Sequence, residues 1–406
     1  MQTSWEHRYA GRTQQIQSSA IREILKFTQD PEVISFAGGL PAPDAFPIDA
    51  IRAAAETVLT EIGPTALQYS LTEGVVELRE LIAEMAAEQG FKVGMENILI
   101  TSGSQQALDL LGKVFINRGD YIVTDSPSYL GALQAFNVYG VRYIAVPMDD
   151  EGMMLEPLED ALRASPKFIY LVPNFHNPTG VTISYERRMR ILDLAFQYGV
   201  PVVEDDPYGK LRYEGEHIPP MVALDAIHRE DCQEQYCGNV LYMSTFSKTL
   251  APGLRMAWVI APAEVIRKMV QAKQGADLHS PTLNQYIAFE AARNGFLDQY
   301  IQKIKALYGE HRLVMLQALE EHFPASVKWT KPQGGMFLWV TLPEGMDAAK
   351  LLPKAVARKV AFVPGAPFHP NGGGENTMRL NFSNSSPDLI RKGIAQLGQV
   401  LKAELG

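Results

Sequence analysis

One lysine in this sequence stands among residue types that suit covalent chemistry on a phosphorylated aldehyde. Lys248 lies in a stretch of small hydroxyl residues that ends in an arginine, comprising Ser244, Thr245, Ser247 and Arg255. A lysine amine is a useful nucleophile toward aldehydes when its surroundings move its pKa from about 10.4, and hydroxyls with a planar guanidinium suit a phosphate. Schiff-base chemistry with pyridoxal phosphate is the common use of such a lysine. Alone, the pattern could equally be a surface turn.

Polar groups also follow the ends of apolar runs at three further places. The runs cover residues 121–123, 168–172 and 202–203. The polar residues after them are Asp125, Ser126, Ser128 and Tyr129, then Asn174, His176, Asn177 and Thr179, and finally Glu204, Asp205, Asp206 and Tyr208. Ligands of open α/β sheets gather at the carboxyl ends of the strands. Together with the lysine stretch, these clusters predict one shared site.

A candidate anion site follows the apolar run at residues 97–101. Gly103, Ser104 and Gln105 form a small polar turn, and the apolar residues after it repeat at helical spacing. The free N–H groups and the positive dipole end of such a helix attract anions. A serine cap that binds nothing gives the same pattern, so this motif is weak by itself.

The succession of apolar runs predicts an α/β protein. Several strand-like runs are almost continuous rather than alternating in polarity, which is typical of strands covered on both faces. Helical patterns separate most of them, for example at residues 184–198, where Ser184 is a suitable cap. We therefore expect a large domain at residues 48–290, built around a largely parallel sheet that helices cover.

The character of the chain changes after residue 290. A long amphipathic helical pattern at residues 297–322 leads to short strand-like runs, and Ser386 with Pro387 marks the start of a final helix. Short strands mixed with helices predict a smaller α+β domain. We expect this domain to comprise residues 291–406 together with the irregular residues 1–47.

The composition argues against several classes of protein. The 406 residues are 46% hydrophobic and 20% charged, which is typical of a globular protein with a sizeable core. A net charge of -9 without a basic tract argues against nucleic acid as a partner. No apolar run approaches the ~18 residues that would span a bilayer, and the first residues lack a signal-peptide pattern. We expect a cytoplasmic protein with neither nucleic acid nor membrane as a partner.

Two cysteines are too few for a disulfide framework. Cys232 and Cys237 lie near His228, an arrangement that gives a weak hint of a metal site. Two free thiols in a polar surface loop are the simpler interpretation, and we assign no metal ligand.

Taken together, these motifs resemble those of the class I and II aminotransferases, which are pyridoxal-phosphate enzymes of fold type I. The subgroup of 2-aminoadipate and kynurenine aminotransferases is the most similar. The resemblance covers essentially the whole chain and rests, besides the lysine stretch, on Phe36-Ala37-Gly38-Gly39-Leu40-Pro41, Leu67-Gln68-Tyr69-Ser70, Gly103-Ser104-Gln105-Gln106, Asn177-Pro178-Thr179-Gly180, Asp205-Asp206-Pro207-Tyr208 and Met378-Arg379-Leu380. It implies a mostly parallel seven-stranded sheet in the large domain and a mobile N-terminal segment in the small one.

The resemblance also implies an activity. The enzyme would move an amino group between an L-amino acid and 2-oxoglutarate by a ping-pong mechanism through a Lys248 aldimine. The amino acid would be 2-aminoadipate, glutamate, or an aromatic or branched-chain amino acid. Lys248 would then move the proton between the substrate α-carbon and the cofactor.

The other cofactor contacts that the resemblance implies come from several loops. Asp205 would pair with the protonated pyridine nitrogen, and Tyr208 would donate to the phenolic oxygen of the ring. Since Asp206 is adjacent, it is the rival for the pyridine contact, and the three-residue step to Tyr208 favours Asp205. The remaining contacts would be made by Ser104, Gln105, Tyr129, Asn177, Thr245, Ser247 and Arg255.

Substrate and subunit contacts follow from the same resemblance. Arg379 would bind the substrate α-carboxylate, helped by Asn177 and the Gly39 N–H. Arg22 matches an arginine on a mobile N-terminal helix that pairs with the distal carboxylate of aminoadipate or glutamate. Tyr69 would reach the phosphate of the neighbouring subunit, so the resemblance implies a homodimer with shared active sites.

Several points stay open from the residues alone. His176 could touch the pocket, but a loop histidine bonded to backbone is the preferred interpretation. Asn177-Pro178 and Ser126-Pro127 could be cis. A pyridoxal-phosphate carbon–sulfur β-lyase of the same fold is an alternative function. A non-catalytic aminotransferase-like sensor is another, although it would carry a basic winged-helix domain ahead of this region.

Overall fold

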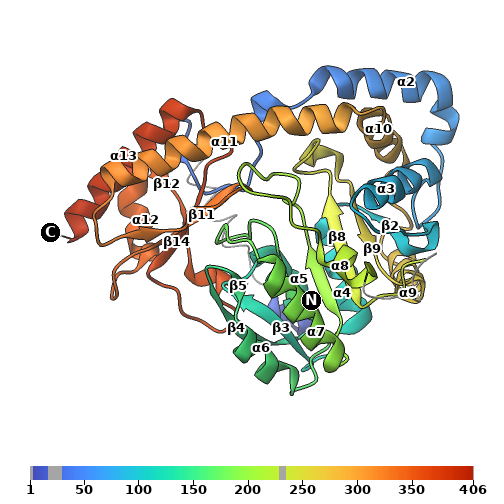
Figure 1. Cartoon of the computed structure of the whole chain (residues 1–406), viewed down its shortest axis with the longest axis horizontal. Helices are drawn as coiled ribbons and strands as arrows, with labels where there is room; N and C mark the ends of the chain where they lie inside the picture. Colours follow the sequence, from blue (N-terminus) through green and yellow to red (C-terminus); the bar gives the residue numbers. More distant parts are fainter. Residues whose placement is uncertain (1–2, 17–29, 228–234, 406) are drawn as a thin grey trace.

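The computed structural model describes residues 3–16, 30–227 and 235–405 (Figure 1). The helical pattern around Arg22 lies outside these residues, as do His228 and Cys232. Cys237 is disulfide-bonded, so the expectation of two free thiols is wrong. No helix in the described ranges is long and apolar enough to span a membrane.

An eight-stranded sheet organises the first part of the described chain. Its strands lie in the order β2-β9-β8-β7-β6-β3-β4-β5. Neighbours from β4 to β8 pair in parallel, whereas β9, β2 and β5 pair antiparallel. The bounds are β2 Ile98–Thr101, β3 Tyr121–Ser126, β4 Arg142–Asp149, β5 Gly152–Met153, β6 Ile169–Leu171, β7 Val202–Asp205, β8 Val240–Thr245 and β9 Ala257–Ile260.

The expected largely parallel sheet is confirmed, with one strand more than the seven expected. The additional strand is β5, which pairs with the end of β4 over two residues. A strand of this length has no apolar run that sequence patterns could detect.

Side chains alternate between the two faces of this sheet, and helices cover both. Along β8, Val240 and Tyr242 join one apolar cluster, whereas Leu241 and Met243 join the other, as the two-residue period of a strand requires. All of β8 is buried, which explains why its sequence is nearly continuous in apolar residues.

Three helices pack on the face of Leu241, and five pack on the opposite face. The first group consists of α4 Ser104–Phe115, α5 Leu130–Asn137 and α9 Ala263–Gln274. The second consists of α3 Val76–Glu88, α6 Leu155–Leu162, α7 Tyr185–Gln197, α8 Met221–Ile227 and α10 Thr282–Ala292, with α2 Ile48–Ala66 packed on α10. Ser184 caps α7 as expected, since its side chain accepts a hydrogen bond from the Arg187 N–H.

A second, smaller group of strands is formed mainly by the C-terminal part of the chain. One sheet has the order β10-β11-β14-β13, and a two-stranded parallel sheet joins β1 to β12. Their bounds are β1 Ile34–Ser35, β10 Lys328–Trp329, β11 Phe337–Thr341, β12 Val360–Ala361, β13 Val363–Pro364 and β14 Thr377–Asn381. The helices of this region are α12 Ala348–Ala357 and α13 Pro387–Leu405.

One long helix connects the two regions. Helix α11, Phe296–His322, packs on α10 at one end and along α13 at the other (Figure 1). The Phe36 N–H donates to the Ala361 carbonyl and the Phe36 carbonyl accepts from the Asn381 N–H, at 2.8 and 2.9 Å. Residues 34–36 are thereby built into the sheets of the C-terminal region, next to the Gly38-Gly39 turn.

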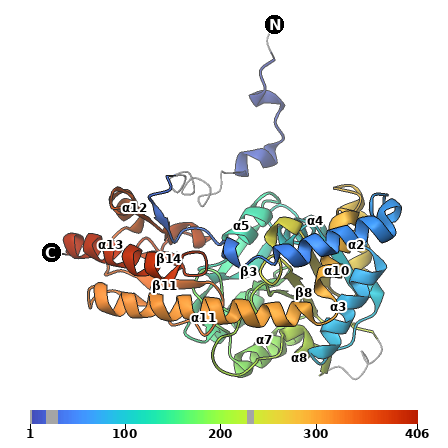
Figure 2. The ribbon, with the colours of Figure 1, turned by 90° about the horizontal axis from the view of Figure 1, so that it is seen from above.

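Short 3-10 helices complete the described secondary structure. They are η1 Glu6–Arg8, η2 Gly11–Gln15, η3 Pro43–Ala45, η4 Met95–Asn97, η6 Pro252–Leu254 and η7 Ala366–Phe368. Figure 2 shows η1 and η2 extending away from the rest of the described chain.

Candidate active site

A cavity of about 290 Å³ lies where the parallel strands β6, β7 and β8 end. Its walls come from the loops after these strands, from the start of α4, from the Gly39 turn and from β11 and β14. Twelve of the residues that the sequence singled out line it: Gly39, Ser104, Gln105, Tyr129, Asn177, Asp205, Tyr208, Thr245, Ser247, Lys248, Arg255 and Arg379. Residues up to 340 positions apart are thus brought to one cavity.

The Lys248 amine lies among cations and apolar walls. The residue follows β8 and is half-buried, and its Nζ donates to the Gly39 carbonyl at 2.8 Å. Burial lowers the pKa of Lys248 to about 8, with Arg379 and Arg255 adding to the effect. A substantial share of this lysine therefore carries a neutral, nucleophilic amine near physiological pH.

Asp205 is the carboxylate that faces this cavity. Its Oδ2 accepts the Tyr170 hydroxyl at 2.8 Å, whereas its buried Oδ1 has no hydrogen-bond partner among the described residues. Burial raises the pKa of Asp205 to about 7. Such a group is suited to pair with a cation that enters the cavity, since a buried carboxylate is costly until it is paired.

The neighbouring carboxylate, Asp206, is occupied elsewhere. Its Oδ1 accepts from the Asn174 side chain at 3.0 Å and from the Gly209 N–H at 2.9 Å. It lines a separate small pocket together with Asn174 and Lys210. Consecutive residues at the end of a strand point to opposite sides, which separates the environments of Asp205 and Asp206.

One end of the cavity collects hydrogen-bond donors that suit a phosphate. The Ser104 hydroxyl, at the first residue of α4, is buried without a partner in the described chain. Thr245 and Ser247 bond each other through their hydroxyls at 2.9 Å, and Arg255 donates to the Ser102 carbonyl at 3.4 Å. A helix N-terminus next to a guanidinium is an anion site.

Gly103 allows this close approach of the arginine. Its φ is +83°, and a Cβ at this position would lie 2.0 Å from a guanidinium nitrogen of Arg255. Any other residue would displace Arg255 and would strain the backbone.

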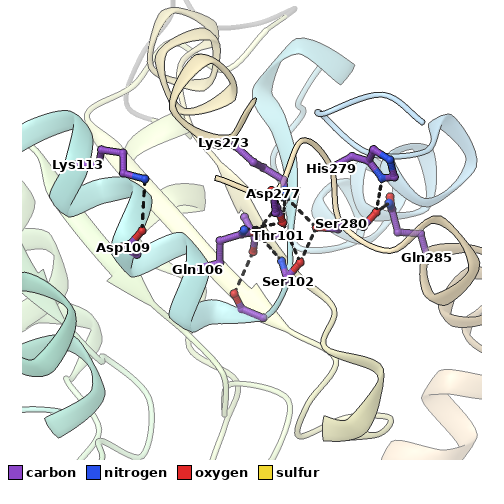
Figure 3. A network of polar contacts seen from close by, with 11 residues as sticks. Thr101, Ser102, Gln106, Asp109, Lys113, Lys273, Asp277, His279, Ser280 and Gln285 are labelled. Atoms are coloured by element: carbon purple, nitrogen blue, oxygen red, sulfur yellow. Dashed lines mark hydrogen bonds and ion pairs between the residues drawn. The ribbon is translucent and has the colours of Figure 1, made fainter. Parts of the chain in front are cut away.

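A polar network holds the turn before α4 in place (Figure 3). The Lys273 ammonium is fully buried and donates to Asp277 at 2.8 Å and to the Gln106 Oε1 at 3.0 Å. The same Gln106 oxygen accepts the Ser102 N–H at 2.8 Å, and the Gln106 amide donates to Asp277 at 2.6 Å. Lys273 is therefore connected to the phosphate end of the cavity through a single side chain.

Arg379 brings a second buried cation to the cavity from β14. It donates to the Asn177 Oδ1 at 2.8 Å and to the Ala37 carbonyl at 2.7 Å. Its guanidinium carbon lies 4.3 Å from the ring centroid of Phe337 and 5.2 Å from that of Phe368. Burial lowers the pKa of Arg379 to about 10, so the group stays charged near neutral pH and suits a small carboxylate.

Two tyrosines complete the cavity. Burial is the main reason that the pKa of Tyr129 is raised to about 12, with Asp205 as a further cause. Burial likewise raises the pKa of Tyr208. The centroids of the Tyr208 and Phe337 rings lie 6.0 Å apart in a T-shaped arrangement. Both hydroxyls are therefore protonated at neutral pH and can donate hydrogen bonds.

Of the remaining candidate residues, the two that the structure describes, Tyr69 and His176, do not line this cavity. Tyr69 is 79% exposed and its ring meets His279 at 5.8 Å, whereas Arg22 lies outside the described residues. His176 is buried, and its Nδ1 is 2.9 Å from the Thr179 hydroxyl and its Nε2 3.7 Å from Asp125. It bonds a side chain rather than backbone and does not line the cavity. The Ser126-Pro127 and Asn177-Pro178 bonds are both cis.

Sequence reasoning missed four residues that line the cavity, namely Val172, Pro207, Pro252 and Phe337. It also missed Tyr170, which lies behind Asp205. Apolar residues and strand tyrosines give no signal that separates a cavity wall from the core. Pro207 and Pro252 could have been found, because they stand between Asp205 and Tyr208 and between Lys248 and Arg255.

Residues 31–397 match the family described as Aminotransferase class I and II. The chain belongs to this family. Two relatives agree with this assignment. An aromatic-amino-acid aminotransferase of Thermococcus litoralis is 47% identical over 96% of this chain and 93% of its own length. The 2-aminoadipate transaminase of Thermus thermophilus is 44% identical over 99% of this chain and 98% of its own length. The aminotransferase assignment is thereby confirmed.

A solved structure of similar fold bears on the cofactor. The α-aminoadipate aminotransferase LysN of Thermus thermophilus, complexed with N-(5'-phosphopyridoxyl)-L-leucine, has a TM-score of 0.91 and 43% identity, and the match covers 99% of both chains. The aminotransferase described here is a pyridoxal-phosphate enzyme of fold type I. The cavity fits this cofactor, because Asp205 Oδ1 and Ser104 Oγ, which have no partner among the described residues, can bond a ring cation and a phosphate.

Proposed function

We propose that this aminotransferase exchanges an amino group between an L-amino acid and 2-oxoglutarate in two alternating half-reactions. We propose 2-aminoadipate and glutamate as amino donors, with aromatic and branched-chain amino acids also accepted. The observation that carries the proposal is that the Lys248 amine and the Arg379 guanidinium line one cavity. The names of the relatives, which include aromatic and aminoadipate substrates, support the choice of donors.

The cavity residues have distinct roles in this proposal. Bound pyridoxal phosphate supplies an aldehyde for the amino group and a ring that withdraws electrons. Lys248 would hold the cofactor through its amine and would move the proton of the substrate α-carbon. Asp205 would pair with the ring nitrogen of the cofactor, Tyr208 and Asn177 would bond its ring oxygen, and Tyr129 would pack on the ring.

Anionic groups are bound at the two ends of the cavity. The phosphate accepts hydrogen bonds from Ser104, Gln105, Thr245, Ser247 and Arg255. The α-carboxylate of the substrate is bound by Arg379, with Asn177 and the Gly39 N–H beside it. Because Asn177 already bonds Arg379 at 2.8 Å, the guanidinium is oriented before the substrate arrives.

Arg22 is proposed to select dicarboxylic amino acids. It lies outside the described residues, so this role rests on the sequence resemblance. We expect Arg22→Ala to raise KM for 2-aminoadipate about 10-fold or more, the scale of a lost charge-assisted hydrogen bond. KM for leucine and phenylalanine should stay nearly unchanged, and equal losses for all four amino acids, including glutamate, would exclude the role.

We further propose a homodimer, a two-domain division and a cytoplasmic location. Tyr69, with 79% of its surface exposed, has no contact with its own cavity and suits a contact with a partner's phosphate. The extended segment with exposed Trp5 and Tyr9 suits a partner as well (Figure 2). The pairing of β1 with β12 supports a small domain of residues 1–47 and 291–406, beside a large cofactor domain at 48–290.

The test is a single half-reaction followed by absorption. Cofactor-loaded enzyme is mixed, without any oxo acid, with L-2-aminoadipate, L-glutamate, L-leucine or L-phenylalanine. We expect the visible cofactor band to give way to a near-ultraviolet band with one oxo acid formed per site. Continuous release of oxo acid and ammonia, with the visible band retained, would identify a lyase instead.

A further inference from the structure

Tyr170 lies directly behind the carboxylate that faces the cofactor cavity. It occupies the middle of β6, is 1% exposed and pairs across the sheet with Val203 of β7. Asp205 is two residues beyond Val203 and therefore points to the same face of the sheet. The Tyr170 side chain reaches past Val203 toward Asp205, and its hydroxyl donates to the Asp205 Oδ2 at 2.8 Å.

Packing around the Tyr170 ring fixes the position of its hydroxyl. The centroids of the Tyr170 and Phe136 rings lie 5.7 Å apart in a T-shaped arrangement. Tyr170 belongs to the apolar cluster on that face of the sheet. Tyr170 does not line the cavity, so it touches neither substrate nor cofactor. A side chain locked by packing positions its hydrogen-bond partner well.

The two oxygens of Asp205 are consequently unequal. Oδ2 is occupied by Tyr170, whereas the buried Oδ1 has no partner in the described chain. A hydroxyl donor to a carboxylate favours its ionised form. This opposes burial and the nearby Asp206, which both favour the protonated form of Asp205. The other titratable groups whose charges interact with Asp205 are Tyr129 and Tyr208.

We propose that Tyr170 is a positioning residue that keeps Asp205 ionised and turned so that Oδ1 meets the ring nitrogen of the cofactor. The proposal rests on the proposed role of Asp205. Removal of the hydroxyl should weaken the contact between Asp205 and the ring nitrogen, and should leave the phosphate and aldehyde contacts intact.

The test compares two cofactors on two matched variants. Dissociation constants are measured by titrating cofactor-free protein with pyridoxal phosphate and with its 1-deaza analogue, in which carbon replaces the ring nitrogen. Tyr170→Phe should weaken binding of pyridoxal phosphate about 10-fold to 100-fold, the range for a hydrogen bond to a charged group. Binding of the deaza analogue should change by less than about 3-fold, since that analogue has no nitrogen for Asp205 to meet.

Tyr236→Phe is the control for loss of a buried tyrosine hydroxyl. Tyr236 also donates to a carboxylate at 2.8 Å, that of Asp225, and it is 1% exposed. Neither residue lines the cavity, so Tyr236→Phe should leave both dissociation constants unchanged. A loss in Tyr236→Phe equal to that in Tyr170→Phe would overturn the proposal.

Asp205→Asn separates a failure of this inference from a failure of the proposed site. Asp205→Asn could weaken the binding of pyridoxal phosphate alone, while Tyr170→Phe weakens the binding of both ligands equally or of neither. In that case Asp205 keeps its role and the inference about Tyr170 is wrong. If neither variant distinguishes the ligands, the role of Asp205 itself is wrong and the inference falls with it.

A third variant keeps the test decisive if Tyr170→Phe fails to fold. Incorporation of 3-fluorotyrosine at position 170 retains the hydroxyl and makes it more acidic, hence a better donor. Binding of pyridoxal phosphate should tighten relative to the deaza analogue. A change in the opposite direction, or equal changes for both ligands, would overturn the proposal.

Discussion

At the scale of single residues, the described lining of the cavity combines three cationic side chains with one carboxylate. Lys248, Arg255 and Arg379 line it together with Asp205. The burial of Asp205 and Arg379 strengthens their electrostatic interactions, because the surrounding dielectric is lower than that of water. Burial also moves the pKa values of Lys248, Asp205 and Arg379 toward neutrality, and the charge of Arg379 further lowers the pKa of Lys248.

Arg379→Lys should retain the positive charge but lose the planar guanidinium with its paired N–H donors. A lysine offers a point charge and cannot bond two carboxylate oxygens in a plane. We expect KM for amino acid substrates to rise about 10-fold to 100-fold, the scale of one lost charge-assisted hydrogen bond. Steady-state kinetics with saturating cofactor measure this, and an unchanged KM would remove Arg379 from the substrate site.

Arg255→Lys is the matched comparison. Arg255 lies at the phosphate end of the cavity, so its replacement should weaken retention of the cofactor during dialysis. With excess cofactor present, KM for the amino acid should stay close to that of the unaltered enzyme. The two arginine variants should therefore show separate defects.

The pKa of Lys248 predicts the pH dependence of cofactor capture. Only the neutral amine reacts with an aldehyde, and the pKa is lowered to about 8 chiefly by burial. The initial rate of reaction between cofactor-free enzyme and pyridoxal phosphate should therefore rise with pH through a midpoint near 8. In Arg379→Gln the midpoint should move upward, because this cation helps to lower the pKa of Lys248. A midpoint above 10 in the unaltered enzyme would contradict the assignment.

At the scale of elements, the turn before α4 depends on a helix that never touches the cavity. The Lys273 ammonium on α9 donates a hydrogen bond to the Gln106 Oε1, which also accepts one from the Ser102 N–H (Figure 3). Removing one partner from a buried charged network leaves its other members unpaired.

We expect Lys273→Met to lower the free energy of unfolding by about 3 kcal/mol. We also expect it to weaken cofactor binding about 10-fold, which corresponds to the loss of one hydrogen bond at the phosphate end. Denaturant unfolding and cofactor titration measure the two effects. Lys268→Met is the control, since Lys268 is an exposed lysine of the same helix that contacts Gln271. Equal behaviour of the two variants would show that α9 does not support the phosphate end.

The elements also show what the sequence could and could not predict. Clusters after β3, β6, β7 and β8 could be joined into one site because parallel strands end at a common edge. The Ser184 cap likewise placed α7, and the amphipathic pattern placed α11, within a residue or two of their observed bounds. Local chemistry is sufficient for such features.

Other features depend on contacts that no local pattern contains. Tyr170 reads as a core residue of a buried strand, and only the alignment of β6 with β7 places its hydroxyl beside Asp205. Phe337 reads in the same way, yet its ring covers Arg379. By contrast, the three-residue step to Tyr208 already favoured Asp205 over Asp206, and Asp205 is the one of the two that lines the cavity.

At the scale of the whole molecule, the proposed homodimer makes a prediction about mixed subunits. Tyr69→Ala removes a residue proposed to serve the partner's cavity, and Lys248→Ala disables a subunit's own cavity. In a mixed dimer, the Tyr69→Ala subunit receives an intact tyrosine from its partner and retains Lys248. An equal mixture after subunit exchange should therefore regain about a quarter of the unaltered activity, because half the dimers hold one complete site.

The control for this mixture is each variant alone at the same total concentration. Absence of any gain after exchange, with mixed dimers demonstrated by mass spectrometry, would mean that Tyr69 acts within its own subunit or not at all. Tyr185→Phe, a change to another exposed tyrosine at the start of α7, should not alter activity.

The pairing of β1 with β12 has a consequence for the order in which the enzyme matures during synthesis. The eight-stranded sheet is complete in sequence by residue 260, so this part, with Lys248 and Asp205, can assemble while the chain is still growing. The Gly39 turn follows β1, and β1 has no strand partner until residues 360–361 emerge from the ribosome. Arg379 emerges later still. Under the proposed roles, a nascent chain therefore acquires its lysine and its carboxylate well before the arginine that binds the substrate carboxylate has been synthesised.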